Sequence, residues 1–167
     1  MMNKQLMTVF KASLGGGAFA IALALLTGKT GLEGREYNPY YDVAGVLTVC
    51  DGHTGRDIIK TKTYTDAECD ALTKADLQRI ARQIDPNIKV KLPETVHAAV
   101  YTFAYNVGAG AFNSSTMLKK LNAGDTIGAC NELQRWVYTK DKNGKPVKWK
   151  GLMNRRDVET TVCKWSL

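Results

Sequence analysis

Three oxygen-bearing side chains near the start of the chain have the types and spacing needed to cleave a glycosidic bond. Glu33 and Asp42 lie nine residues apart, and Thr48 follows six residues later. This reaction needs one carboxylic acid to protonate the leaving oxygen and a second carboxylate to activate water or stabilise the oxocarbenium-like transition state. The two histidines and four cysteines form no recurring metal-ligand pattern. We therefore expect a carboxylate enzyme without a metal or cofactor.

The two carboxylates are expected to occupy contrasting surroundings. Glu33 lies in G-L-E-G, where a helix would end against a sheet, and a half-buried setting favours the protonated acid. Asp42 begins the turn D-V-A-G, where exposure would keep it ionised. Thr48 would place a hydroxyl across the hairpin, able to hold a water. Glutamate at a helix end and aspartate in a turn are commonplace, so purely structural roles are the alternative.

The elements that would position these residues can be read from local patterns. Residues 36–55 are rich in tyrosine, valine and threonine and are interrupted by Pro39 and several glycines, which predicts a small β-hairpin or meander. Thr65 and Glu68 match the capping box, and apolar residues at near-helical spacing predict a helix over about 66–84, which Pro86 ends.

Further helices are predicted downstream. Pro93 suits the first turn of a buried central helix that ends at Gly108. Ser114 or Ser115 can cap a short helix, and Asp125 or Thr126 can cap another that runs to residue 136. A polar loop at 140–145 precedes a last helix at about 151–165. This order predicts an α+β fold with a small N-terminal β lobe and a helical C-terminal lobe.

The first thirty residues resemble an export signal. They carry Lys4, Lys11 and Lys29 and no acid, and residues 13–28 are uncharged. A spanning helix needs ~20 mainly apolar residues. This run is shorter and is diluted by three consecutive glycines, so we expect a weak transmembrane segment over residues 1–30. The A-x-A pattern at Ala22 to Ala24 lies inside the apolar run, which favours an uncleaved segment over a cleaved one.

Such a weak segment could leave the membrane and become an amphipathic or core helix. Glu33 follows its end by only five residues, so a change in the position of the helix would move the expected acid. This is a physical route from membrane release to activation. An inert anchor with no regulatory role is the alternative.

The four cysteines are even in number, widely spaced and without a C-x-x-C pair, which favours two disulfides over zinc binding. Four cysteines allow three connectivities, and the sequence does not choose among them. Proximity along the chain favours Cys50 with Cys69 and Cys130 with Cys163. Buried free thiols in a reducing compartment are the alternative.

Length and charge limit the class of protein. The 167 residues suffice for one catalytic domain plus an appendage, and we expect a monomer. The net charge of +7 favours anionic membranes or cell-wall polymers. Nucleic acid is not an expected partner, because the chain has no long basic run and no basic stripe interleaved with aromatic residues.

Three stretches together resemble the phage-type lysozymes, the muramidase endolysins of tailed phages. They are G-L-E-G-R-E-Y-N-P-Y-Y-D-V-A-G-V-L-T-V-C-D-G-H-T-G (31–55), F-A-Y-N-V-G-A-G-A-F (103–112) and W-K-G-L-M-N-R-R (149–156). The resemblance covers residues 31–167, the expected catalytic domain, and implies a glycan cleft between the two lobes. It also implies that the enzyme cleaves the β-1,4 bond between N-acetylmuramic acid and N-acetylglucosamine in peptidoglycan and so lyses the host cell.

The resemblance also implies roles for individual residues. Glu33 would be the general acid, and Asp42 with Thr48 would orient and deprotonate the attacking water, which gives inversion. Arg155 would hold Glu33 in place, although Arg156 could substitute for it. His53 would be a structural residue that hydrogen-bonds within the β lobe. Phe103 and Ser115 would line the glycan groove, with a core residue and a helix cap as the alternative roles, and Tyr105 and Asn106 are further candidates for the groove.

The N-terminal run is similar to the signal-anchor-release segments of one branch of this family. It would tether an inactive enzyme to the periplasmic side of the host inner membrane and later release it into the periplasm. No cysteine lies between residues 1 and 49, so a thiol switch is not expected. Two other functions remain open: a wall-binding protein without catalysis, and a lytic transglycosylase, which would not need the pair of Asp42 and Thr48.

Overall fold

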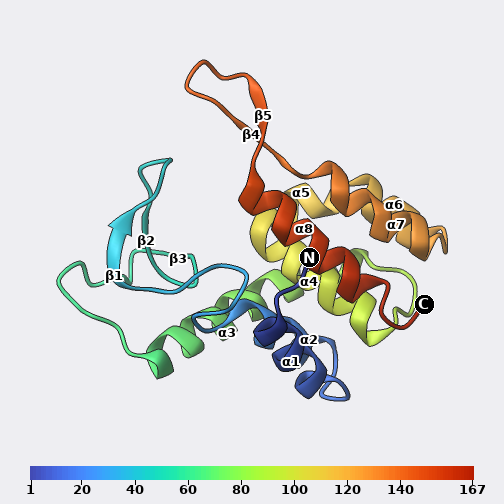
Figure 1. The fold of residues 1–167 in the computed structure, drawn as a ribbon, viewed down its shortest axis with the longest axis horizontal. Coiled ribbons are helices and arrows are strands. Elements are labelled where there is room, and N and C mark those ends of the chain that lie inside the picture. The colour runs from blue at the N-terminus through green and yellow to red at the C-terminus, as the bar shows by residue number, and fades with distance from the viewer.

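A computed structural model describes residues 1–167 and has the predicted α+β architecture (Figure 1). Strands β1 (Glu36–Tyr41), β2 (Leu47–Cys50) and β3 (His53–Thr54) form an antiparallel meander in that order. Tyr40 pairs with Thr48 across β1 and β2, and Thr48 pairs with Thr54 across β2 and β3. Thr48 therefore lies on the central strand, and the turn that begins at Asp42 connects this strand to β1.

The helical lobe is built around α4 (Glu94–Val107), most of whose residues are buried. Helix α4 packs against α3 (Asp66–Ile84), α5 (Ala109–Asn113) and α8 (Lys150–Cys163). Helices α6 (Thr116–Asn122) and α7 (Thr126–Glu132) and two short 3-10 turns, at Asp85–Asn87 and Leu133–Arg135, complete the lobe. The expected central, buried helix is confirmed.

Side-chain caps determine where several of these helices begin. The Thr65 hydroxyl accepts a hydrogen bond from the Glu68 backbone N–H at 3.3 Å, and Glu68 Oε2 accepts one from the Thr65 N–H at 2.9 Å, which confirms the capping box. Of the alternative caps, Ser115 begins α6 and Asp125 begins α7. These caps satisfy backbone donors that have no partner in the first turn of a helix.

The N-terminal segment forms two helices, α1 (Lys4–Ser13) and α2 (Ala18–Leu26), that pack into the domain. Gly15 and Gly17 between them adopt φ values of +85° and +87°, which glycine reaches without a steric penalty. Ile21, Leu25 and Leu26 are completely buried, and α2 packs against α4. None of the helices combines the length and apolar character that crossing a bilayer requires.

Two disulfides join Cys50 to Cys69 and Cys130 to Cys163, the pairing that proximity favoured. The first ties the end of β2 to α3, and the second ties α7 to α8. The expectation of a loop at 140–145 was incomplete, because residues 141–145 form the turn of a second hairpin, β4 (Tyr138–Lys140) with β5 (Pro146–Lys148). Its strands are short and lysine-rich, so they lack the alternation of apolar and polar residues that marks a half-buried strand.

Candidate active site

Glu33 lies in the loop between α2 and β1, and backbone hydrogen bonds to the end of α2 fix this loop. The Leu32 N–H donates to the Leu25 carbonyl at 2.8 Å, and the Gly31 N–H donates to the Gly28 carbonyl at 3.0 Å. The Glu33 side chain is 17% exposed, which matches the half-buried setting expected for it. The position of Glu33 therefore depends directly on where α2 packs.

Arg155 on α8 holds one oxygen of Glu33. Its Nη1 donates to Glu33 Oε1 at 2.5 Å, its Nη2 to the Thr102 carbonyl at 2.8 Å, and its Nε to Glu159 Oε1 at 2.9 Å. Because each guanidinium nitrogen has a partner on a different element, the group is fixed in position. Arg156 instead donates to Glu159, Asn106 and the Trp136 carbonyl. The structure thus assigns the contact with Glu33 to Arg155 and not to Arg156.

The second oxygen of Glu33 faces Gly52, at the turn between β2 and β3. A Cβ placed on Gly52 would lie 3.6 Å from Glu33 Oε2, and the φ of Gly52 is +88°, a conformation that other residues rarely adopt. Glu33 also borders a cavity of about 720 Å³ whose wall includes Arg35, Asn38 and Tyr40. Oε2 is therefore the oxygen that Arg155 leaves free.

Asp42 forms the turn between β1 and β2 with its own side chain. Its Oδ1 accepts hydrogen bonds from the backbone N–H groups of Ala44 and Val46, both at 2.9 Å. The turn is closed by the Asp42 N–H, which donates to the Val46 carbonyl at 3.0 Å. The same carbonyl accepts the Thr48 hydroxyl at 2.9 Å. Thr48 and Asp42 are thus connected through Val46, and no hydrogen bond uses Asp42 Oδ2.

Tyr40 lies within the electric field of both carboxylates. Burial, followed by the negative charges of Glu36, Asp42 and Glu33, raises the pKa of the Tyr40 hydroxyl. Tyr40 lines the cavity at Glu33 and precedes Asp42 by two residues on the same edge of the sheet. Tyr40 is therefore the residue that connects the cavity at Glu33 with the turn at Asp42, while Asp42 and Thr48 themselves do not line this cavity.

His53 connects the β lobe to α3. Its Nδ1 lies 2.7 Å from Asp76 Oδ2, and its Nε2 lies 3.2 Å from both oxygens of Asp57. The hydrogen bond with Asp76 is the main cause that raises the pKa of His53, with a further contribution from Asp57. A structural role was expected for His53, but its main partner lies on α3 rather than within the β lobe.

Of the two roles expected for Phe103 and Ser115, the structure shows the core residue and the helix cap instead of places in the groove. Phe103 is completely buried and packs against Phe112 and Trp136, as residues on the inner face of α4 must. Ser115 is buried as well, and its hydroxyl caps α6 by accepting the Leu118 N–H at 3.1 Å. Neither side chain is available to a substrate.

Several residues that support the site were not singled out from the sequence. Glu159 contacts both Arg155 and Arg156, and its spacing of four and three residues on one helix was a signal that could have identified it. The weaker groove candidates also have internal partners, since Tyr105 donates to the Asp51 carbonyl and Asn106 accepts from Arg156. No local pattern pointed to Gly52 or Tyr40.

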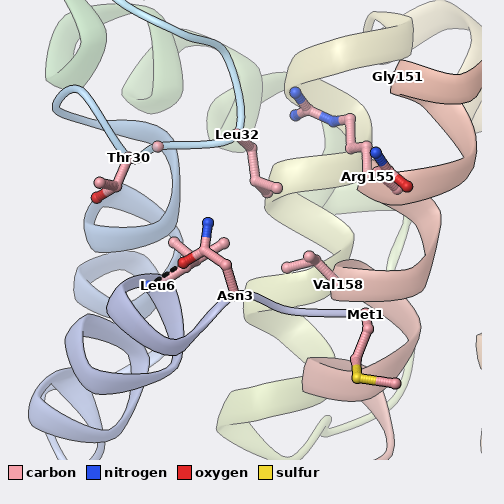
Figure 2. Close-up of a pocket in the computed structure, with 10 residues that line it drawn as sticks. Met1, Asn3, Leu6, Thr30, Leu32, Gly151, Arg155 and Val158 are labelled. Carbon is pink, nitrogen blue, oxygen red and sulfur yellow. Dashed lines mark hydrogen bonds between the residues drawn. The ribbon is translucent and has the colours of Figure 1, made fainter.

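Arg155 also lines a second cavity, of about 380 Å³ (Figure 2). The N-terminal residues Met1, Asn3 and Leu6 form one side of it, and Arg155 and Val158 on α8 form another. The loop that leads to Glu33 closes it with Thr30 and Leu32. The N-terminal segment, the acid loop and α8 therefore meet at one place.

Comparisons with known proteins identify the family of this chain. The family model described as "Phage lysozyme" matches residues 30–159. The chain belongs to the phage lysozyme family. Among relatives of this phage lysozyme, the SAR-endolysin of Bacteriophage PS119 is 55% identical over 98% of this chain and 97% of its own length. That of Enterobacteria phage P21 is 53% identical over 98% of both chains.

Solved structures share the fold of this phage lysozyme. The endolysin from Escherichia coli O157:H7 phage FAHEc1 is 25% identical and superposes with a TM-score of 0.75 over 100% of this chain and 95% of its own. The likeness therefore includes the N-terminal helices as well as the residues that match the family model.

Proposed function

We propose that this phage lysozyme cleaves the β-1,4 bond between N-acetylmuramic acid and N-acetylglucosamine by an inverting mechanism. As a phage lysozyme related to SAR-endolysins, it degrades peptidoglycan and lyses the host cell. The observation that best supports the finer proposal is the arrangement of Glu33. Arg155 holds one of its oxygens, the other faces Gly52, and the residue borders the cavity next to the β lobe.

Glu33 is the proposed general acid. Arg155 fixes Oε1, so the proton for the leaving sugar oxygen is carried by Oε2 on the side of Gly52. The positive charge of Arg155 is shared with Glu159. Once Glu33 has given up its proton, the carboxylate that forms is stabilised by the arginine that already contacts it.

Asp42 and Thr48 are proposed to prepare the attacking water. The turn uses Oδ1 of Asp42, which leaves Oδ2 to take a proton from water. The Thr48 hydroxyl donates to the Val46 carbonyl, so its remaining lone pairs can accept the second O–H of that water. This arrangement directs the oxygen of the water toward the anomeric carbon. Inversion follows when water attacks opposite the leaving group.

The N-terminal segment is proposed to have two successive roles. Residues 1–30 export the chain uncleaved and tether it to the inner membrane, so that the catalytic domain at 31–167 faces the periplasm. After release, the segment folds into α1 and α2. The burial of Ile21, Leu25 and Leu26, and the hydrogen bond from Leu32 to Leu25, support a requirement for this refolding before Glu33 is in place.

Products and stereochemistry test the chemistry. Purified peptidoglycan treated with the enzyme should release muropeptides with reducing ends, seen by mass spectrometry, and the first product anomer should have the inverted configuration. Glu33→Gln should lower the rate by about 10²- to 10⁴-fold, because the amide can still accept from Arg155 but cannot donate the acid proton in the same way. Products with a 1,6-anhydro end would show a transglycosylase instead.

A second experiment tests the role of the N-terminal segment. Residues 29–167 fused to a cleavable export signal should fold poorly and lyse weakly, because α2 is missing from the core. Full muramidase activity of this shortened chain would count against any structural role for the segment.

A further inference from the structure

The hairpin formed by β4 and β5 extends from the helical lobe with both faces uncovered (Figure 1). Every residue from 138 to 150 is exposed except Asp141, which is partly buried. An isolated two-stranded hairpin is at best marginally stable in water. Here Asp141 Oδ1 supports the turn by accepting the backbone N–H groups of Asn143 and Lys145 at 2.8 Å and 2.9 Å. The hairpin is thus held in shape without any packing partner.

The charge of the hairpin is strongly one-sided. Its only acid is Asp141, whose Oδ1 is occupied by the turn. The lysine salt bridges of the chain involve Lys62 and Lys120 instead of the hairpin. The unpaired cationic side chains of the hairpin are Lys140, Lys142, Lys145, Lys148 and Lys150. This surface is complementary to a partner that carries several negative charges.

Large apolar side chains are interleaved with these lysines. Tyr138 and Trp149 are 53% and 59% exposed, and the Lys148 Nζ lies 5.9 Å from the Tyr138 ring centre. Exposed aromatic residues are enriched at surfaces that bind a partner. The hairpin can therefore make apolar contacts as well as ionic ones.

The hairpin is directly connected to the catalytic region. The Trp149 N–H donates to the Val137 carbonyl at 2.9 Å and closes the base of the hairpin, and α8 begins at the next residue. Arg155, which holds Glu33, follows six residues after Trp149. In Figure 1 the hairpin extends away from α1 and α2, toward the same edge as the turn between β1 and β2. A partner that binds the hairpin is thus expected near the cleaved glycan, whereas the proposed membrane segment lies on the opposite side of the molecule.

We propose that this hairpin is a second contact surface for the cell wall, and that it binds the acidic peptide stems of peptidoglycan beside the glycan strand being cleaved. The stems carry free carboxylates, which fit the lysines, and aliphatic groups, which fit Tyr138 and Trp149. The proposal rests on the proposed muramidase function, because it assumes that a glycan strand lies at Glu33.

The test compares a variant that loses four positive charges from the hairpin with a control variant that loses four from elsewhere on the surface. The hairpin variant is K140Q/K142Q/K145Q/K148Q. The matched control is K74Q/K91Q/K119Q/K164Q, which alters four exposed lysines that form no salt bridge and lie outside both the hairpin and the site. Each set is also placed in the Glu33→Gln background, so that co-sedimentation with purified sacculi measures binding without digestion. Rates are measured on intact sacculi and on glycan strands stripped of their stems by an amidase.

The hairpin variant should bind intact sacculi about tenfold more weakly than the control, the size expected for four weak surface contacts. The difference should shrink at high salt, and Lys→Arg substitution at the same four positions should restore binding. Rates on stem-free glycan should be equal for the hairpin and control variants that retain Glu33. Thermal unfolding midpoints equal to that of the parent enzyme would show that folding is intact.

Three results would overturn the proposal. The hairpin variant could equal the control on sacculi, or it could lose as much on stem-free glycan as on sacculi. It could instead lose binding only to vesicles of phosphatidylglycerol and phosphatidylcholine, which would identify a membrane surface. A wild-type enzyme that releases reducing ends from neither substrate would contradict the muramidase assignment itself, which is a separate outcome.

Discussion

Asp42 and Asp141 close two different hairpins with the same set of hydrogen bonds. In each turn Oδ1 accepts the N–H groups of the residues two and four positions later, at 2.8 to 2.9 Å. In each, a glycine three positions later has a φ of +76° and donates to the aspartate carbonyl. Asp42 therefore stabilises its turn whether or not it takes part in catalysis. Only its Oδ2 is left for a catalytic role.

Substitutions at Asp42 should separate the turn from the chemistry. Asp42→Asn keeps an oxygen that can accept both N–H groups but loses the carboxylate, so kcat should fall by about 10²- to 10⁴-fold with nearly unchanged stability. Asp42→Ala should lose activity and also about 1 kcal/mol of unfolding free energy. Asp141→Ala is the matched comparison for stability and should show a similar loss in urea unfolding. An Asp42→Asn enzyme with normal kcat would remove Asp42 from the mechanism.

The neighbouring arginines provide a test of the positioning of Glu33. Arg155→Met and Arg156→Met each remove a buried cation from Glu159, so each should cost about 3–5 kcal/mol of stability. Only Arg155 contacts Glu33. At a temperature where both variants are folded, Arg155→Met should therefore lower kcat at least tenfold, and Arg156→Met should retain most of it. Equal losses in the two variants would indicate that the cluster acts only on stability.

Substitutions of two leucines in α2 can separate the contribution of the N-terminal segment to folding from the contribution of its hydrophobicity to export. Leu25 is completely buried, whereas Leu23 is partly exposed. Leu25→Ala should cost about 2–5 kcal/mol of unfolding free energy, with a cavity left in the core, and Leu23→Ala should cost clearly less. Both changes remove the same apolar group from the proposed export segment, so the fraction that reaches the membrane should be similar. Equal unfolding midpoints in urea would contradict the packing of α2.

The stability of the enzyme should depend on pH through His53. Asp76, itself bonded to Arg79, and Asp57 both face the ring and raise its pKa in the folded state. The stabilisation is thus fully present below the unfolded pKa of about 6.5 and is lost as pH rises through the higher folded value. The difference in unfolding free energy between the parent enzyme and His53→Gln should be larger near about pH 6 than near about pH 9.

His97 provides the control for that experiment. It faces a single carboxylate, Asp85, at 3.0 Å and its side chain is 25% exposed, compared with 9% for His53. His97→Gln therefore controls for the loss of a histidine side chain in general. A His53→Gln profile parallel to that of the parent enzyme across this range would show that the histidine does not carry the effect.

Features that depend on neighbours in the chain were predictable from the sequence. The capping box of α3 and the glycine that ends α4 act within a few residues of one another, so residue type and spacing determined them. The glycan-cleaving candidates were also found from spacing, together with the resemblance to a family. The β4–β5 hairpin was missed because its strands lack a buried face, and a buried face is what gives a strand its recognisable pattern.

Features that depend on packing were decided only by the tertiary structure. Arg155 reaches Glu33 across 122 residues of chain, and the adjacent, chemically identical Arg156 does not. Phe103 is buried because its position on α4 faces the core, although the resemblance to the family had also allowed a place in the glycan groove. The apolar run at residues 18–26 suits a membrane or a protein core equally well by composition. Its burial against α4 was decided by contacts between distant segments, which no local pattern records.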